Sequence, residues 1–483
     1  LYIDRSADLS QKEIAKIATF LDNNPSVKLI LYLKKYHESK FSSLIPRASL
    51  IFYENRGEPE IETAPNFPEK VIFIGETGFS YQNIFEPISV ERIDHLTHLS
   101  TFSIAAATIL GGFVLGKTVE ESLKMARTNV EKSTLNASLT LNELESAVSN
   151  SPESNLEFIA ANLVLKGKGI LAADESGGSI KKKFDQLNIP DTFENRHTYR
   201  NIFFTTPNIE KYLNGVILFD ETARDHMANG QTIPDFLISK RIIPGIKVDQ
   251  GLEKFENSEE TYTKGLDGLE NRLAEYYKMG LRFAKWRAAF NLTLNENGDV
   301  LTPTDLAIQE NARILAEYAK KCQSAGIVPI VEPELVYDGY YKIEHSEKIT
   351  SKILDQLMNA LKEKSVNLRG CILKINMVMN GKQLENHSTP EEIGQATAKV
   401  LKNHVSKELA GVVFLSGGQT PEEATNNLAE ITKNGPFAFP VTFSYARALQ
   451  DPALYAWSGD NNNIEKARQA FLGRLIENVK ALN

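Results

Sequence analysis

Eight short apolar segments alternate with helical segments through residues 156–483, and this alternation restricts the fold more than any other feature of the chain. Consecutive strands that are joined through helices pair in parallel, because a parallel connection needs a crossover. Eight such units predict an α/β fold, the (β/α)₈ or TIM barrel. The expected strands cover residues 169–173, 215–219, 242–248, 283–289, 327–331, 371–375, 411–415 and 440–443. The expected helices include residues 268–279, 305–325 and 391–402.

Residues 1–150 are predicted to form a smaller α/β domain that precedes the barrel. Its expected elements are a helix over 11–21 and strands over 27–33, 48–53 and 71–74. The polar, turn-rich residues 149–155 predict the domain boundary, so that the barrel domain spans residues 151–483.

Two features of the first domain bear on membranes and metals. Residues 102–115 form the most apolar run in the chain, but the run is short and contains Gly111 and Gly112. We therefore expect a buried helix there and no membrane segment. His95 and His98 are three residues apart, but no cysteine or acidic residue completes a site, so we expect no metal.

The charge balance excludes one class of function. The chain has 62 acidic and 54 basic residues and a net charge of −8, which argues against nucleic-acid binding but leaves small anionic substrates possible. Its two cysteines, Cys322 and Cys371, lie in apolar runs and are expected to be free, buried thiols. With no signal peptide apparent, these features indicate a cytoplasmic protein.

Polar and charged residues gather where the predicted strands end, which is the end of a (β/α)₈ barrel that carries the chemistry. Strands three to six each carry a pair of such residues spaced two apart, and this spacing places both members on one face of a strand. Together they predict a single charged mouth. The residues at the strand ends are Asp174, Glu175, Lys247, Asp249, Lys285, Arg287, Glu332, Glu334, Lys374, Asn376, Ser416, Gly417, Gly418, Ser444, Tyr445 and Arg447.

Lys374 lies in the middle of the apolar segment 370–378. A buried ammonium is costly unless it is paired or neutral, and a neutral lysine attacks carbonyl groups to form a Schiff base. The alternative is an edge strand with Lys374 facing water. Repulsion from Lys285 and Arg287 would favour the free amine.

Other residue types at the mouth match the steps that such chemistry needs. Glu332, Glu334 or Asp174 would transfer protons. The segment Ser416-Gly417-Gly418 precedes a helix start and predicts an anion site of backbone amides, which Arg447 would join. A plain glycine-rich turn is the alternative reading of that segment.

These residues belong to motifs by which the second domain closely resembles class I fructose-bisphosphate aldolase, the metal-free Schiff-base type. The motifs, in the order and spacing of that family, are GKGILAADES, GIKVDQG, FAKWR, IVPIVEPE, LKINMV, FLSGGQ and FSYARALQ. The resemblance implies reversible cleavage of fructose 1,6-bisphosphate to dihydroxyacetone phosphate and glyceraldehyde 3-phosphate, without a cofactor. It also implies a homo-oligomer, commonly a tetramer.

The resemblance assigns roles to individual residues. Lys374 is the implied Schiff-base lysine, with Glu334 as general acid/base and Glu332 beside it. Asp174 would handle the proton of the C4 hydroxyl. The remaining implied substrate-facing residues are Lys285 and Arg287, then Ser416, Gly417, Ser444 and Arg447 at the ketose phosphate, and Ser179 and Lys247 near the other phosphate.

Four departures from the family bear on these roles. Ile375 replaces a usual proline, and Ala446 replaces a usual glycine whose amide helps to hold phosphate. Lys183 replaces a usual arginine, which would turn a bidentate phosphate contact into a point charge. The family's animal members end in a tyrosine that assists proton exchange, whereas this sequence stops at Asn483. We expect enamine protonation to be slower or to use another group.

The first domain weakly resembles the C-terminal part of ribokinase-type sugar kinases. The Gly-Ala-Gly-Asp motif of that family is replaced by residues 99–103, Leu-Ser-Thr-Phe-Ser, so a degenerate and non-catalytic remnant is expected rather than a kinase–aldolase fusion. Two alternatives to the aldolase remain at this point. One is a Schiff-base aldolase for another phosphosugar. The other is a barrel scaffold whose first domain binds a sugar phosphate or a protein partner.

Overall fold

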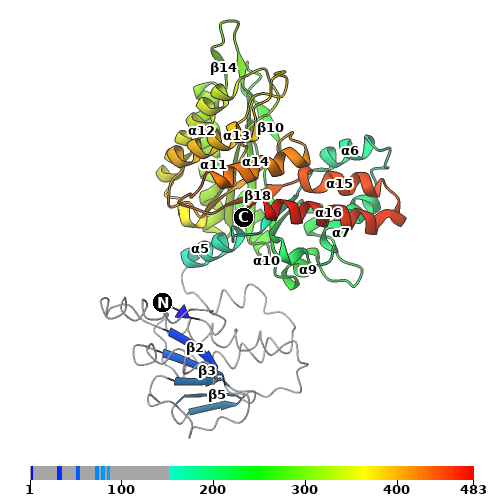
Figure 1. Ribbon diagram of the computed structural model, residues 1–483, viewed down its shortest axis with the longest axis vertical. Coiled ribbons are helices and arrows are strands. Elements are labelled where there is room, and N and C mark those ends of the chain that lie inside the picture. The colour runs from blue at the N-terminus through cyan, green and yellow to red at the C-terminus, as the bar shows by residue number, and fades with distance from the viewer. Residues whose placement is uncertain are drawn as a thin grey trace. The chain divides into compact units, whose positions relative to one another are not determined.

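The computed structural model describes residues 152–482 and six short strands among residues 1–150 (Figure 1). Contacts between Cα atoms divide the chain into two compact units, Leu1–Asn150 and Ser151–Asn483. We describe each unit by itself.

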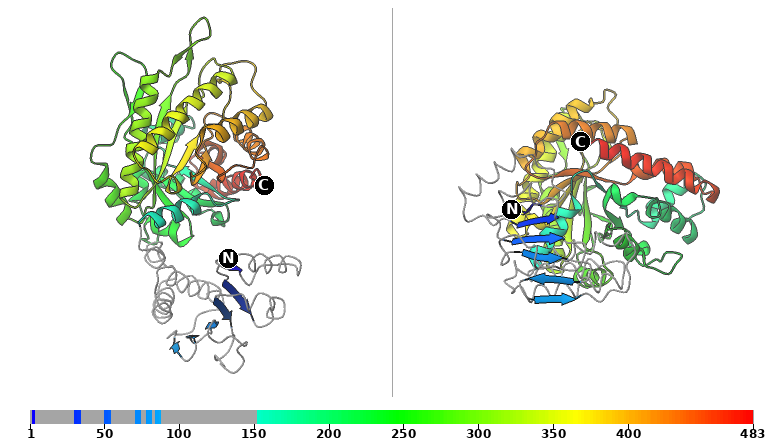
Figure 2. Two further views of the ribbon diagram at one scale, coloured as in Figure 1. Left: turned by 90° about the vertical axis from the view of Figure 1, so that its left-hand side faces the viewer. Right: turned by 60° about the horizontal axis from the view of Figure 1, so that its bottom comes forward.

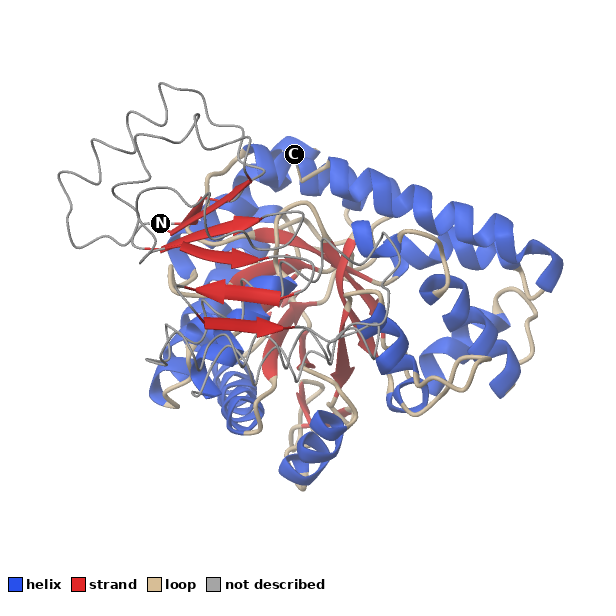
Figure 3. Cartoon of the chain, turned by 90° about the horizontal axis from the view of Figure 1, so that it is seen from below, coloured by secondary structure: helices blue, strands red, loops and turns tan. Residues whose placement is uncertain are grey.

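The first unit contains a six-stranded sheet (Figure 3) with the strand order β1-β2-β3-β4-β5-β6. Strands β1 to β4 pair in parallel, and β5 and β6 are added antiparallel. Three of the strands overlap the segments predicted from the sequence. The bounds are β1 Tyr2–Ile3, β2 Ile30–Lys34, β3 Leu50–Glu54, β4 Val71–Ile74, β5 Gly78–Tyr81 and β6 Ile84–Pro87. The predicted helices over 11–21 and 102–115, and His95 with His98, lie outside the described residues.

The second unit is a closed barrel of eight parallel strands with helices around it (Figure 2), which confirms the predicted (β/α)₈ fold. Strand β18 pairs with β7 and closes the barrel. All eight predicted segments form strands because their continuous apolar runs suit a sheet that is buried on both faces. The strands are β7 Gly169–Ala173, β8 Leu213–Leu218, β9 Ile243–Lys247, β12 Phe283–Phe290, β15 Val328–Leu335, β16 Ile372–Ile375, β17 Gly411–Phe414 and β18 Val441–Tyr445.

Helices follow most of these strands and cover the outside of the barrel (Figure 1). They are α5 Pro152–Leu163, α6 Gly177–Asp185, α7 Phe193–Phe204, α8 Asp220–Ala223, α9 Ile233–Ser239, α10 Leu269–Lys278, α11 Asp305–Ser324, α12 Ile343–Glu363, α13 Pro390–His404, α14 Pro421–Lys433, α15 Arg447–Trp457 and α16 Ile464–Lys480. Two small hairpins, β10 Leu252–Lys254 with β11 Thr261–Thr263 and β13 Thr293–Leu294 with β14 Val300–Thr302, extend the loops. Among the described residues, none of the helices is long and apolar enough to cross a membrane.

Helix α5 fills the lower end of the barrel, where the strands begin. Its buried face packs into an apolar cluster with inward-facing residues of the strands, such as Ile170, Phe283 and Ile372. Glycines within or just before three strands leave room for the helix and the residue that follows it: a Cβ on Gly215 would lie 2.8 Å from Leu163, and one on Gly411 would lie 2.9 Å from Val164. Gly245 likewise leaves room for the Phe283 ring, because a Cβ on Gly245 would lie only 2.4 Å from that ring. The lower half of the interior is therefore packed mainly with apolar side chains, and the buried charged side chains of the strands lie above it.

Candidate active site

On β12 and β15 both charged residues of each pair lie within the strand, which corrects the expected end of β15 at residue 331, whereas Asp249 and Asn376 lie just beyond β9 and β16. Strand β15 continues through Glu332 and Glu334 to Leu335, and β12 continues through Lys285 and Arg287 to Phe290. The two strands pair residue by residue along this length, including Arg287 with Glu332. Opposite charges on neighbouring strands stabilise each other, so the charges do not end the strands.

Four buried charged groups meet above the apolar cluster. Lys374 Nζ lies 3.1 Å from Glu332 Oε1, and Lys285 Nζ lies 3.3 Å from Glu332 Oε2. Lys285 Nζ also lies 2.9 Å from Asp174 Oδ2. Each of these side chains is at most 11% exposed, so water screens their interactions weakly. We call Asp174, Lys285, Glu332 and Lys374 the central cluster.

The cluster fixes the charge states of its middle members. Burial alone would raise the pKa of Glu332, but Lys285, Lys374 and Arg287 outweigh burial and hold that pKa below its ordinary value. Burial alone would lower the pKa of Lys285, but Asp174, Glu332 and Asp249 outweigh it and raise the pKa above its ordinary value. In the protein without substrate, Lys285 is therefore positively charged and Glu332 is a carboxylate.

This arrangement changes the expected surroundings of Lys374. The sequence pattern predicted two positive side chains beside it, whereas its contact is the carboxylate of Glu332, which also faces Lys285. Arg287 forms an ion pair with Glu334 instead. The repulsion that Lys374 feels from Lys285 and Arg287 is therefore opposed by attraction to a carboxylate, because Glu332 lies between Lys374 and Lys285 and Glu334 pairs with Arg287.

The loop of residues 416–418, which the sequence predicts to bind an anion, comes close to Glu334. We call it the anion loop. A Cβ on Gly417 would lie 3.8 Å from Glu334 Oε1, so the loop of residues 416–418 faces that carboxylate. Gly418 has a φ of +84°, a conformation that favours glycine. Helix α14 begins just after this loop with a capping box formed by Thr420 and Glu423.

The end of β18 and the start of α15 follow next to this loop. The strand ladder pairs Phe414 with Phe443. Ser416 comes two residues after Phe414 and Ser444 comes one residue after Phe443, so both serines lie at the ends of neighbouring strands. Ser444 is 1% exposed, and its Oγ has no hydrogen-bond partner within the described protein. Arg447 is exposed and is the first residue of α15. We call Ser416, Gly417, Ser444 and Arg447 the phosphate cradle.

Two polar residues at the strand ends turn away from the mouth. Tyr445 is fully buried and donates to Ala424 O of α14 at 3.1 Å. Asn376 lies after β16 and accepts from Leu335 N at 2.9 Å, which ties the ends of two strands together. Both have structural roles.

Lys247 ends β9 beside Lys285 of β12, and Ser179 lies on α6, which follows β7. Lys247 Nζ lies 2.6 Å from Asp249 Oδ1, and Lys247 pairs with Lys285 in the strand ladder. Ser179 is exposed on α6, with its Oγ 3.2 Å from Ser176 Oγ. Asp249 belongs to the site because it also lies 3.9 Å from Lys285 Nζ. The spacing of two between Lys247 and Asp249 was the available signal for it.

A second ionic network, not foreseen from the sequence, lies behind Asp174. Lys183 Nζ donates to Glu175 Oε1 at 3.0 Å, to Gln450 Oε1 at 3.0 Å and to Asp451 Oδ1 at 3.3 Å. Arg200 forms a further ion pair with Glu175. The three hydrogens of the Lys183 ammonium are thus engaged within the protein, so the expectation that Lys183 faces a phosphate does not fit this arrangement.

No group of three or more histidine, cysteine, aspartate or glutamate residues among the described residues is arranged to hold a metal ion. Cys322 and Cys371 are free and buried, as expected. The groups available are a buried lysine, carboxylates beside it and an anion loop, which suit carbonyl chemistry on an anionic substrate.

Comparisons with known proteins agree with this reading. The family model described as fructose-bisphosphate aldolase class-I matches residues 155–483. The fructose-bisphosphate aldolase of Plasmodium falciparum is 45% identical over 327 residues, which are 68% of this chain and 88% of that protein. A cytosolic fructose-bisphosphate aldolase of Arabidopsis thaliana is 44% identical over 324 residues, covering 67% and 81%.

A solved structure is similar over the same part of the chain. It is a co-crystal structure of the P. falciparum fructose-bisphosphate aldolase in complex with TRAP and a small-molecule inhibitor, with a TM-score of 0.67 and 44% identity. The similarity covers 69% of this chain and 95% of that one.

Proposed function

The chain belongs to the class I fructose-bisphosphate aldolase family, and we propose that the central cluster and the phosphate cradle carry out the reaction of that family. The activity is the reversible cleavage of fructose 1,6-bisphosphate to dihydroxyacetone phosphate and glyceraldehyde 3-phosphate through a lysine Schiff base. The observation that carries the assignment of residues is the contact of buried Lys374 with Glu332 at 3.1 Å.

Lys374 is the nucleophile in this proposal. Its amine adds to the C2 carbonyl of the ketose, and water leaves the carbinolamine to give the iminium ion. Glu332 is the group in direct contact with Lys374 Nζ, so it supports the proton transfers at this nitrogen better than Glu334, which is paired with Arg287. In this proposal Glu334 assists the bond cleavage from its position beside Gly417 of the anion loop.

Asp174 takes the proton of the C4 hydroxyl as the C3–C4 bond breaks. The electron pair of that bond moves into the iminium group and gives the enamine, while the aldehyde forms at C4. Lys285 Nζ lies 2.9 Å from Asp174 Oδ2 and holds that carboxylate in place. Asp174 then returns this proton to C3 of the enamine, and water hydrolyses the Schiff base, which releases the ketose phosphate and restores the amine of Lys374.

Positive charge at both ends of the mouth accounts for a bisphosphate substrate. The phosphate cradle holds the phosphate of the ketose half, because it combines loop amides, an unpartnered buried hydroxyl on Ser444 and the exposed Arg447. Lys247 and Ser179 hold the phosphate of the aldehyde half, and Arg287 lines the path between the two ends. No cofactor takes part.

Three wider assignments complete the proposal. Residues 1–150 act as a separate, non-catalytic α/β domain, a degenerate sugar-kinase remnant. The barrel assembles as a homotetramer, for which exposed apolar side chains such as Leu301 and Leu306 offer contact area. A cytoplasmic location is in keeping with the cytosolic relative from Arabidopsis.

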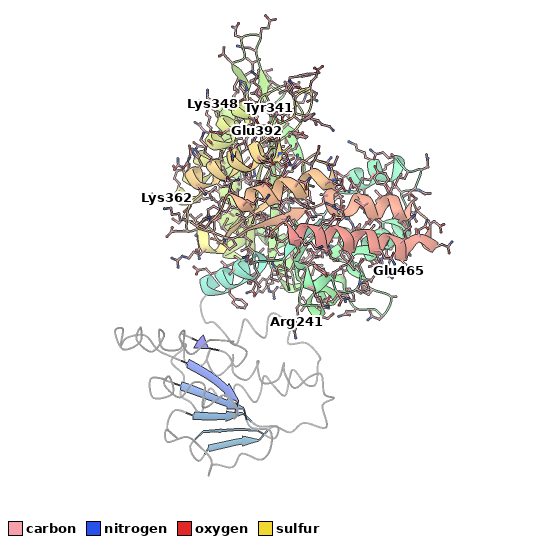
Figure 4. All side chains as sticks on the ribbon, in the orientation of Figure 1. Arg241, Tyr341, Lys348, Lys362, Glu392 and Glu465 are labelled. Carbon is pink, nitrogen blue, oxygen red and sulfur yellow. The ribbon has the colours of Figure 1, made fainter. Side chains whose placement is uncertain are left out.

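The decisive experiment traps the covalent intermediate. The full chain is incubated with fructose 1,6-bisphosphate, reduced with borohydride, digested and analysed by mass spectrometry. We expect the added mass on the peptide that carries Lys374, its loss in Lys374→Met, and no change in Lys348→Met, an exposed lysine on α12 (Figure 4). A folded protein that gives no adduct, or an adduct on another lysine, would refute the assignment of Lys374.

A further inference from the structure

Arg474 of helix α16 joins the first turns of the two helices that begin at the phosphate cradle. Helix α16 runs beside α14 and α15 (Figure 1). The Arg474 guanidinium donates to Pro421 O and, at 2.5 Å, to Thr425 Oγ1 of α14. Its Nε donates to Ala448 O of α15 at 3.2 Å. The Arg474 side chain is 8% exposed, so these bonds form largely out of water.

The Ala448 carbonyl needs an outside donor because of Pro452. In an α-helix this carbonyl would accept from the backbone N–H of residue 452, and proline has none. Ala448 is completely buried, and a buried carbonyl without a partner is costly. Arg474 supplies the bond that the backbone of α15 lacks.

Helix α14 is held from the same side. Thr425 Oγ1 lies 3.0 Å from Asn478 Oδ1, one helical turn beyond Arg474 on α16. Glu477 and Glu422 pair with the Arg474 guanidinium and balance its charge. Because its donors are taken up by these groups, Arg474 acts on the cradle through the two helices and has no role as a direct phosphate ligand.

We propose that Arg474 is a positioning residue that sets the distance between the two halves of the phosphate cradle. One half, Ser416 and Gly417, lies just before α14, and the other consists of Ser444 at the end of β18 and Arg447 at the start of α15. A bidentate guanidinium bound to both helix starts fixes their separation, and a phosphate held by both halves is sensitive to that separation. This inference rests on the proposed function of the cradle.

The test measures binding of dihydroxyacetone phosphate by calorimetry and cleavage kinetics of the full chain. In Arg474→Lys, which keeps the charge and loses the fork, we expect the Kd for dihydroxyacetone phosphate and the KM for fructose 1,6-bisphosphate to rise roughly tenfold. We expect kcat to stay within about twofold, because the central cluster is untouched. A general loss of structure would lower kcat and the amount of active enzyme together.

The matched control is Arg468→Lys on the same helix. Arg468 binds Thr205 Oγ1 at 2.7 Å and Glu465 (Figure 4), and it contacts neither helix of the cradle. Its Kd and KM should equal those of the wild type. If Arg474→Lys does not fold, Thr425→Val removes one acceptor of the guanidinium at nearly constant volume and should raise the Kd roughly threefold.

Two outcomes separate this inference from the proposed function. A wild-type Kd in Arg474→Lys or Thr425→Val, with binding lost in Arg447→Met, overturns the role of Arg474 and leaves the cradle in place. A wild-type Kd in Arg447→Met overturns the cradle itself, and the inference with it.

Discussion

Replacing Glu175 by glutamine should make the barrel unit less stable at neutral pH and less sensitive to acid. Burial alone would raise the pKa of Glu175, but Arg200 and Lys183 outweigh it and lower the pKa from 4.5 to about 2. At 1.36 kcal/mol per pKa unit, this difference of about 2.5 corresponds to about 3 kcal/mol of stability. The same magnitude is typical of removing one partner from a buried ion pair.

The sign of the pH dependence follows from the lowered pKa. The folded state favours the carboxylate, so the contribution of Glu175 is fully present above pH 4.5 and is lost as the pH falls toward 2. About 1.4 kcal/mol of it should be gone at pH 3.5. The difference in unfolding free energy between wild type and Glu175→Gln should therefore shrink from about 3 kcal/mol at pH 7 to roughly half of that at pH 3.5.

Tryptophan fluorescence during urea unfolding is the appropriate assay. Both tryptophans of the chain, Trp286 and Trp457, are buried in the barrel unit, so the signal reports on that unit alone. Asp185→Asn is the control, because Asp185 forms an ion pair with Lys181 on the same helix in which both side chains are 56% exposed. Exposed pairs of this kind contribute little. Equal stabilities of wild type and Glu175→Gln, or a difference that does not depend on pH, would refute the reasoning.

Two further substitutions test the packing of the barrel and of the cradle. Gly245→Ala should lower stability by about 3 kcal/mol, because its Cβ would lie 2.4 Å from the buried Phe283 ring. Gly473→Ala in α16 has open space around the new methyl group and should raise stability by about 0.5 kcal/mol. Equal changes in the melting temperatures of the two variants would contradict this reasoning. Ala446→Gly should leave the KM for fructose 1,6-bisphosphate within about twofold, because a φ of −101° suits any residue. It should lower stability by about 1 kcal/mol, because the methyl group packs against the apolar cluster. A large fall in KM would instead mean that the methyl group obstructs phosphate binding.

The strands and most of the mouth were predictable because their signals are local. An apolar run bounded by turn residues identifies a strand, and a spacing of two places Glu332 and Glu334 on one face. The helix over 305–325 was found as α11, Asp305–Ser324, because its apolar residues recur with helical spacing.

The pairing of charges was not predictable, because it joins residues far apart in sequence. Lys183 meets Asp451, 268 residues later, and Glu332 meets Lys374 on the next strand. The spacing of residues within one strand or helix does not indicate which residues of another element they will contact. The same holds for the end of β15, which was expected at residue 331 but continues to Leu335, because this part of the strand pairs with β12.

The packing of α5 into the lower end of the barrel has a consequence for the order of events during turnover. Ile372 lies in the sealed apolar layer, and Lys374 is the next residue of β16 on the same face, directly above it. A substrate bonded to Lys374 is thus attached at the bottom of the barrel mouth, directly above the apolar layer that closes the barrel from below. The half that is bonded to Lys374 therefore leaves after the free aldehyde and, in the direction of bond formation, arrives before it, so the closed end of the barrel imposes an order on the two products.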